Sequence, residues 1–192
     1  MVRYDSQHKD ATRRRIIEAA GERLKRDGID GSGVAVLMAD AGLTNGAFYT
    51  HFTSKEDLVA TAIEDQLRQQ RERYATLGSD REAVEQLVRE YLSIEHRDNP
   101  AQGCPSAALL DEIGRCSDGT KHAYTEGVLA LADVIAVRLA PRNPQSARGQ
   151  VLNVFALLFG TLQLSRALSD RRLADEVLAR GIDNALALLP RE

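Results

Sequence analysis

Hydrophobic residues recur along most of this chain at intervals of three or four, which is the spacing of one face of an α-helix. The first such stripe consists of Ile16, Ile17, Ala20 and Leu24. We expect this helix to begin near Asp10 and to end at Gly28, because glycine readily adopts the left-handed conformation that closes many helices.

The same periodicity continues toward the end of the sequence. Further helices are expected at about 34–41, 45–51, 54–77, 80–92, 105–113, 118–139, 145–168 and 170–189. Ser54, Asp80 and Asp170 stand where N-caps are expected, and 98–103 is the clearest loop. No segment shows the alternation of a strand flanked by hairpin turns. The predicted fold class is all-α, with about nine helices.

Composition adds an expectation about location. Hydrophobic residues make up 43% and charged residues 28% of the 192 residues, as in soluble globular proteins. The N-terminal segment lacks the apolar centre of a signal peptide. The longest apolar stretch, 151–164, is interrupted by polar residues and falls short of the ~20 residues of a membrane span. We expect a cytoplasmic protein with no membrane association.

Charge and cysteine content limit the partners without identifying them. The net charge is −3, yet residues 1–55 carry nine Lys and Arg against seven Asp and Glu, so charge permits DNA binding without demonstrating it.

Two cysteines, Cys104 and Cys116, are too few for a disulfide framework or a zinc site, and no cofactor or metal is expected. Cys104 precedes Pro105 at a predicted helix start, where the helix dipole favours reaction of a thiol. It is either a redox or electrophile sensor or an ordinary buried thiol.

Two very short predicted helices, 34–41 and 45–51, are joined by a tight turn, which is the geometry of a helix-turn-helix. Gly42 can end the first helix in the left-handed conformation, and Leu43 turns inward to anchor the turn. Thr44 can cap the next helix and can also reach a phosphate.

The second of these helices has one apolar face. Phe48 and Phe52 are four residues apart and are expected to point inward. The outward positions are Asn45, Ala47, Thr50 and His51, with Tyr49 at the edge. Small and hydrogen-bonding side chains on an outward face suit the reading of base edges in the major groove. The alternative is a structural corner with no DNA partner.

The stretch AGLTNGAFYTHF at 41–52, followed by KEDL at 55–58, resembles the DNA-binding signature of the TetR/AcrR family of bacterial transcriptional regulators. The resemblance covers about 13–58. It implies a DNA-binding head over 1–53 and a body over 54–192 that holds a small ligand and forms a homodimer. It also implies a DNA surface lined by Ser32, Thr44, Asn45, Ala47, Tyr49, Thr50, His51 and Lys55. Ala35, Met38 and Gly33 depart from the family pattern, which weakens the case for phosphate contacts from the helix at 34–41.

The predicted body helices have apolar faces wide enough to pack around a cavity. Candidate lining residues are Leu67, Tyr74, Tyr91, Leu109, Ile113, Tyr124, Val128 and Phe159, each of which is otherwise plain core. His96 and His122 are either ligand contacts or surface histidines.

The last two predicted helices are apolar over so much of their circumference that they must be covered on several sides. The expected dimer interface consists of Leu152, Phe155, Ala156, Phe159, Gly160, Leu162, Val177, Ile182 and Leu186. The alternative is a core within one chain.

Three functional classes compete at this point. An enzyme is disfavoured because the sequence has no HExxH motif, nucleophile elbow or phosphate-binding loop. An architectural DNA-binding protein is disfavoured by the net-acidic body. The resemblance favours a repressor that binds a palindromic operator in double-stranded DNA as a dimer and is released by an unknown small-molecule inducer.

Overall fold

The computed structural model of the protein describes residues 2–78 and 80–189, and within them it contains nine α-helices, two 3-10 helices and no strand. The elements are α1 (Val2–Asp27), α2 (Val34–Asp40), η1 (Asn45–Thr50), α3 (Lys55–Ala75), α4 (Arg81–Tyr91), α5 (Ile94–Asp98), η2 (Pro100–Gln102), α6 (Pro105–Arg115), α7 (Asp118–Leu139), α8 (Pro144–Ala167) and α9 (Arg171–Leu188). The predicted all-α fold class is confirmed.

Three elements differ from the sequence prediction. The helix expected at 45–51 is the 3-10 helix η1, and the expected loop at 98–103 contains η2 after the short helix α5. The helix α1 begins at Val2 rather than near Asp10. Gln7 to Asp10 are exposed, so this extension carries no apolar stripe for a sequence pattern to detect. Once the packed part of a helix has formed, each added residue gains a hydrogen bond without a new nucleation cost.

Several helix ends follow the predicted capping chemistry. The side chain of Ser54 accepts a hydrogen bond from the Asp57 N–H, and Asp80 and Asp170 cap α4 and α9 in the same way. Gly28 closes α1 with a φ of 81°, a conformation that an L side chain adopts only at a cost.

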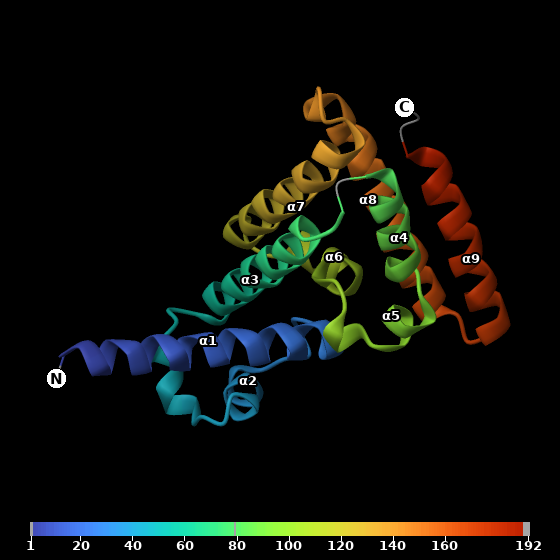
Figure 1. Cartoon of the computed structure of the whole chain (residues 1–192). Coiled ribbons are helices and arrows are strands. Elements are labelled where there is room, and N and C mark those ends of the chain that lie inside the picture. Colours follow the sequence, from blue (N-terminus) through green and yellow to red (C-terminus); the bar gives the residue numbers. More distant parts are fainter. Residues whose placement is uncertain (1, 79, 190–192) are drawn as a thin grey trace.

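The head consists of α1, α2 and η1. In Figure 1, α1 runs through the lower part of the view and α2 lies beneath it. Its core is formed by side chains from all three elements: Ile16, Leu24, Leu37, Met38, Phe48 and Phe52, all nearly inaccessible to solvent. The Arg23 guanidinium also ties α1 to α2, since it donates to both Asp40 carboxylate oxygens at 2.6 and 2.7 Å.

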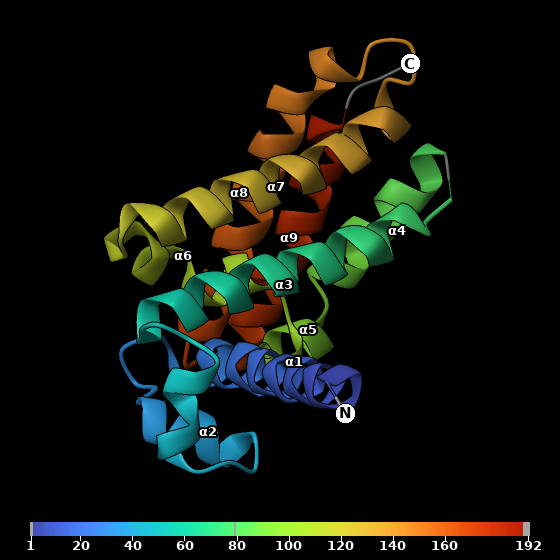
Figure 2. The same cartoon turned by 90° about the vertical axis from the view of Figure 1, so that its left-hand side faces the viewer.

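The remaining helices form a layered body above the head. Figure 2 shows α3 and α7 side by side, with α8 and α9 behind them. Glycines permit two of these close approaches: a Cβ on Gly127 would lie 2.5 Å from Leu67 Cδ1, and one on Gly181 would lie 2.4 Å from Thr161 Cγ2. Because α1 also packs on α3, α6 and η2, it belongs to the head and supports the body.

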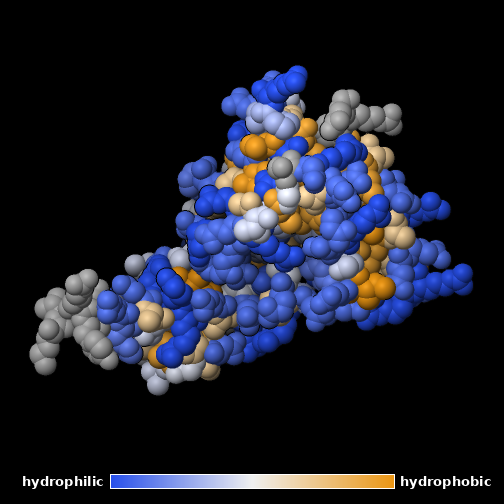
Figure 3. Space-filling model, viewed as in Figure 1, coloured by the Kyte–Doolittle hydropathy of each residue, from blue (hydrophilic) through white to orange (hydrophobic). Residues whose placement is uncertain are grey.

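Hydropathy follows this layering. Figure 3 shows mostly hydrophilic residues on this face of the head, with hydrophobic residues visible mainly over the upper helices. In the part of the chain that the structure describes, no helix combines the length and apolar character needed to cross a membrane.

Candidate nucleic-acid interface and adjoining cleft

The turn between α2 and η1 has the geometry of a Schellman motif. Gly42 has a φ of 68°, its N–H donates to Ala39 O at 2.9 Å, and the Leu43 N–H donates to Met38 O at 2.9 Å. These two bonds satisfy carbonyls at the end of α2 and redirect the chain sharply into η1. The turn therefore fixes the angle at which η1 is presented.

Residues 44–51, named the recognition segment here, are anchored by Phe48 and present their polar side chains outward. Phe48 is 1% exposed and stacks on buried Phe52 with ring centroids 5.9 Å apart. Tyr49 is 76% exposed, and its ring lies nearly perpendicular to the Phe48 ring with centroids 5.2 Å apart. Thr44, Asn45 and Thr50 are exposed and Ala47 is half-buried. The predicted inward face is present, and the outward face is present except at His51, which is half-buried.

The hydroxyl of Thr44 makes no capping hydrogen bond, although the sequence predicted one. The tighter 3-10 turn is closed by the backbone instead, with the Ala47 N–H donating to Thr44 O at 3.1 Å. By contrast, the Thr50 hydroxyl donates to Ala47 O at 2.6 Å. Thr44 therefore keeps its hydroxyl available to an external acceptor.

His51 lies at the boundary between the recognition segment and the head. Its ring is half-buried, and Nδ1 has no hydrogen-bond partner among the described residues. Loss of solvent contact lowers the pKa of His51 below 6.5, and the positive charges of Lys9 and Arg13 lower it further. The guanidinium of Arg13 lies 4.8 Å from the Phe52 ring centroid, so this arginine packs on the head.

Two predicted DNA-surface residues are placed elsewhere. Ser32 is fully buried, and its hydroxyl donates to Gly28 O at 2.7 Å, so the prediction that it lines the surface is wrong: it closes the turn after α1. Lys55 is half-buried, and its ammonium donates to Ile29 O at 2.6 Å, which attaches the start of α3 to the same turn.

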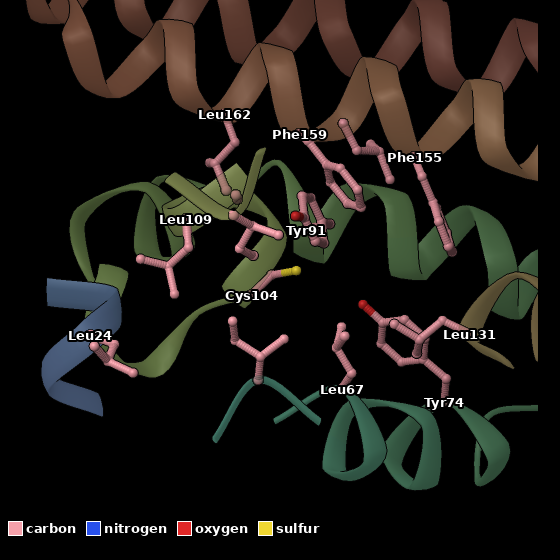
Figure 4. Packing of buried hydrophobic residues seen from close by; sticks show 14 of the residues in the cluster. Leu24, Leu67, Tyr74, Tyr91, Cys104, Leu109, Leu131, Phe155, Phe159 and Leu162 are labelled. Carbon is pink, nitrogen blue, oxygen red and sulfur yellow. The ribbon is translucent and has the colours of Figure 1, made fainter. Parts of the chain in front are cut away.

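A cleft of about 860 Å³ lies beside the head, where α1 faces α3, α4, α5 and the chain around η2. Leu87, Tyr74, Tyr91 and Cys104 form its floor and also line a small apolar extension of about 20 Å³ that reaches Leu131, Phe155, Leu158 and Phe159. Figure 4 shows the Tyr74 hydroxyl and the Cys104 sulfur directed into the space between α3 and α8. One wall of the cleft is therefore a helix of the head.

The cleft holds a buried cation and a neutral histidine. Lys25 is 7% exposed, and its ammonium donates to Gln66 Oε1 at 2.6 Å and to Gly103 O at 3.0 Å. Desolvation lowers the pKa of Lys25. His96 bonds through Nδ1 to Tyr91 O at 2.7 Å and accepts the Cys104 N–H through Nε2 at 3.1 Å. Desolvation lowers its pKa as well, which favours the neutral ring.

Only some of the predicted cavity residues line these spaces. Tyr74, Tyr91 and Phe159 do. The prediction is wrong for Leu67, Leu109, Ile113, Tyr124 and Val128, which do not line either one. The first three are core side chains, and the Tyr124 hydroxyl donates to Ser106 Oγ at 3.1 Å.

The predicted dimer interface divides into two groups. Phe155, Phe159 and Leu162 are buried within the single chain because their face of α8 packs on the body, so they are not free to meet a partner. The opposite face of α8 exposes Ala156 and Gly160. The half-buried members are Leu152, Val177, Ile182 and Leu186.

Sequence reasoning missed Lys25, Leu87, Gln70 and Cys104 as cleft residues. A signal existed for Lys25, because it lies four residues after buried Gly21 and eight after Ile17, on the inward face of α1. The other three come from separate elements that only the tertiary fold brings together.

Comparison with known proteins agrees with this arrangement. Residues 16–62 match the family model described as bacterial regulatory proteins, tetR family. Over 87 residues, 45% of the chain, the sequence is 33% identical to the HTH-type transcriptional regulator TtgR of Pseudomonas putida. That alignment spans 41% of the relative's length.

Solved structures extend the likeness in fold to nearly the whole chain. Reduced NemR of E. coli superposes with a TM-score of 0.78 at 17% identity, covering 95% of this chain and 98% of that one. A TetR-family regulator from Agrobacterium tumefaciens has a TM-score of 0.74 at 19% identity, covering 92% and 98%. The head therefore matches the DNA-binding domain of the tetR family of bacterial regulatory proteins, and the whole chain has the fold of solved TetR-family regulators.

Proposed function

We propose that the protein is a dimeric repressor that places the recognition segment of each subunit in the major groove of a palindromic operator. The observation that carries this proposal is the division of that segment: Phe48 is fixed in the core, while Tyr49 and Thr44 stand outside it. A rigid segment with free polar side chains is what base reading requires. We assign residues 1–53 to DNA binding and 54–192 to ligand binding and dimerisation.

The proposed DNA surface is smaller than the sequence indicated. It contains Thr44, Asn45, Ala47, Tyr49 and Thr50, with His51 and Lys55 at its margin. Arg14 and Arg15 are exposed on α1 and supply positive charge nearby, which favours association with phosphates through counterion release.

Release by a small molecule is supported by the position of the cleft. Lys25 in its wall belongs to α1, the helix that also holds the core of the head. The turn after α1 is tied to the body by Glu112, whose carboxylate accepts the N–H groups of Ile29 and Asp30 at 2.8 and 3.0 Å. A ligand that shifts α1 therefore reorients the head and changes the distance between two heads in a dimer.

A homodimer through α8 and α9 is supported by exposed apolar positions on both helices. Leu164 on α8 is 52% exposed and continues the line of Ala156 and Gly160 at intervals of four residues. Leu173 and Leu188 are exposed on α9. Small residues permit two helices to approach closely, and a two-fold axis matches half-sites about 34–36 Å apart or a multiple of it.

Footprinting on genomic fragments tests the whole proposal. The wild-type protein is expected to protect a pair of half-sites related by two-fold symmetry, and the double variant Thr44→Ala, Tyr49→Ala is expected to lose that protection. Thr125→Ala, an exposed threonine on α7, is the matched control. Sequence-specific protection by the folded double variant contradicts the assignment, and a 21.1 kDa species in sedimentation contradicts the dimer.

A further inference from the structure

A buried hydroxyl without a nitrogen or oxygen partner lies at the floor of the cleft. Tyr91 is 5% exposed, and no nitrogen or oxygen of the described residues bonds its hydroxyl, which has only the weakly accepting sulfur of Cys104 nearby. The side chain lines both the cleft and the apolar extension. A buried hydroxyl in this state is destabilising until an acceptor reaches it.

A second phenol, Tyr74, also lacks an acceptor for its hydroxyl proton. The Tyr74 oxygen accepts a hydrogen bond from Gln70 Nε2 at 2.7 Å, and the described residues offer no acceptor for the Tyr74 proton. The other end of Gln70 is also occupied, because its Oε1 accepts from the Cys104 thiol at 3.4 Å. In this orientation of the amide, the phenolic proton of Tyr74 stays available.

Lys25 adds a positive charge that no carboxylate of the described residues pairs directly, although Glu22 raises its pKa at longer range. Its ammonium has three hydrogens, of which two donate to the neutral oxygens of Gln66 and Gly103. Among the described residues it forms no ion pair, although it is buried. A desolvated cation is costly when no anion is paired with it directly. His96 does not relieve this deficit, because both of its ring nitrogens are engaged.

The cleft mouth limits the charge of a ligand. It carries the exposed carboxylates Glu18, Glu22, Glu90 and Glu95 together with the exposed Arg73. This net negative rim opposes ligands with several negative charges, such as nucleotides. A ligand with a single negative charge can form an ion pair with Lys25 inside the cleft. Its repulsion by the rim carboxylates is weaker, because solvent and salt screen those charges.

From these groups we propose that the cleft binds a small monocarboxylic acid. Its carboxylate oxygens accept hydrogen bonds from Lys25, Tyr74 and Tyr91. Its apolar end points toward Leu87 and Phe159. Because the apolar extension holds only about 20 Å³, that end is no larger than a methyl group or the edge of a ring. Binding of the acid does not depend on the proposed function; only its role as the inducer does.

Calorimetric titration of the full chain without DNA tests the ligand class. The probes are acetate, butyrate and benzoate, each compared with its amide. At least one acid is expected to bind with a Kd below about 1 mM, and its uncharged amide at least about tenfold more weakly. Absence of binding by all three acids, or equal binding of acid and amide, overturns the proposal.

Two tyrosine variants locate the site. Tyr91→Phe deletes the unpaired hydroxyl, so its Tm is expected to equal or exceed that of the wild type while the acid binds about tenfold more weakly. Tyr124→Phe is the matched control: its hydroxyl is bonded to Ser106 outside the cleft, and acid affinity is expected to stay unchanged. Undiminished acid affinity in Tyr91→Phe overturns the site.

Footprinting with the bound acid separates this inference from the proposed function. Loss of operator protection at acid concentrations that saturate the cleft supports both. An acid that binds the wild type and not Tyr91→Phe, yet leaves protection intact, supports the site and contradicts the inducer role alone.

Discussion

The recognition segment and the cleft use polar side chains in opposite settings. In the recognition segment, Tyr49 and Thr44 are solvated and rest on a buried aromatic anchor. In the cleft, Lys25, Tyr74 and Tyr91 are buried and incompletely paired. The comparison teaches that removal of a solvated group changes binding with little effect on stability. Removal of a buried group changes both binding and stability.

The largest expected effect separates an anchor from its exposed neighbour. Phe48→Ala removes a buried ring and is expected to lower the free energy of unfolding by about 3–5 kcal/mol. Tyr49→Ala, at the next position, is expected to change it by no more than about 0.5 kcal/mol because the ring is exposed. Urea denaturation of both variants checks the pair, and equal losses would contradict the orientation of η1.

A smaller effect is expected where the head is attached to the body. Glu112→Ala leaves the Ile29 and Asp30 N–H groups without their acceptor and is expected to cost about 1–3 kcal/mol of unfolding free energy. Glu126→Ala, an exposed glutamate on α7, serves as the control. Denaturation measures the stability, and fluorescence anisotropy with operator DNA is expected to show weaker binding. Wild-type behaviour in both assays would exclude Glu112 as a structural link.

The smallest expected effect concerns pH and the wall of the cleft. The pKa of His96 is lowered in the folded protein, so protonation favours the unfolded chain. Its stabilising contribution is complete above the unfolded pKa of about 6.5 and is lost as the pH falls from there through the folded pKa. The main physical cause is desolvation of the ring, and a protonated Nε2 would also point a hydrogen at the Cys104 N–H.

Melting temperatures measured between pH 7 and pH 5 check this sign. The wild type is expected to lose stability over that interval, and His96→Gln is expected to lose less of it. Substitution of exposed His122 by Gln is expected to leave the pH profile unchanged. A profile in His96→Gln as steep as that of the wild type would assign the pH dependence to other groups.

The head was more predictable from sequence than the cleft, for physical reasons. Its elements are adjacent in the chain, so Gly42 and the spacing of Phe48 and Phe52 define the turn and both faces locally. Ser32 was misplaced because a buried serine that closes a turn has the same local pattern as an exposed one.

The cleft depends on contacts between elements far apart in sequence. Apolar periodicity marked Tyr74 and Tyr91 as inward, but it also marked Leu67 and Leu109, which are plain core. No local signal distinguishes the face of a helix that lines a cavity from the face that packs on a neighbour. For the same reason Phe155 and Leu162 were assigned to a dimer interface, although they pack inside one chain.

The specificity ratio of Tyr49→Ala tests the central claim most directly. This ratio is the affinity of the variant for the footprinted operator divided by its affinity for scrambled DNA at equal salt. Because a lost base contact costs about 1–3 kcal/mol, the ratio is expected to fall about tenfold or more while the Tm stays at the wild-type value. A ratio equal to that of the wild type would mean that the recognition segment does not read the bases.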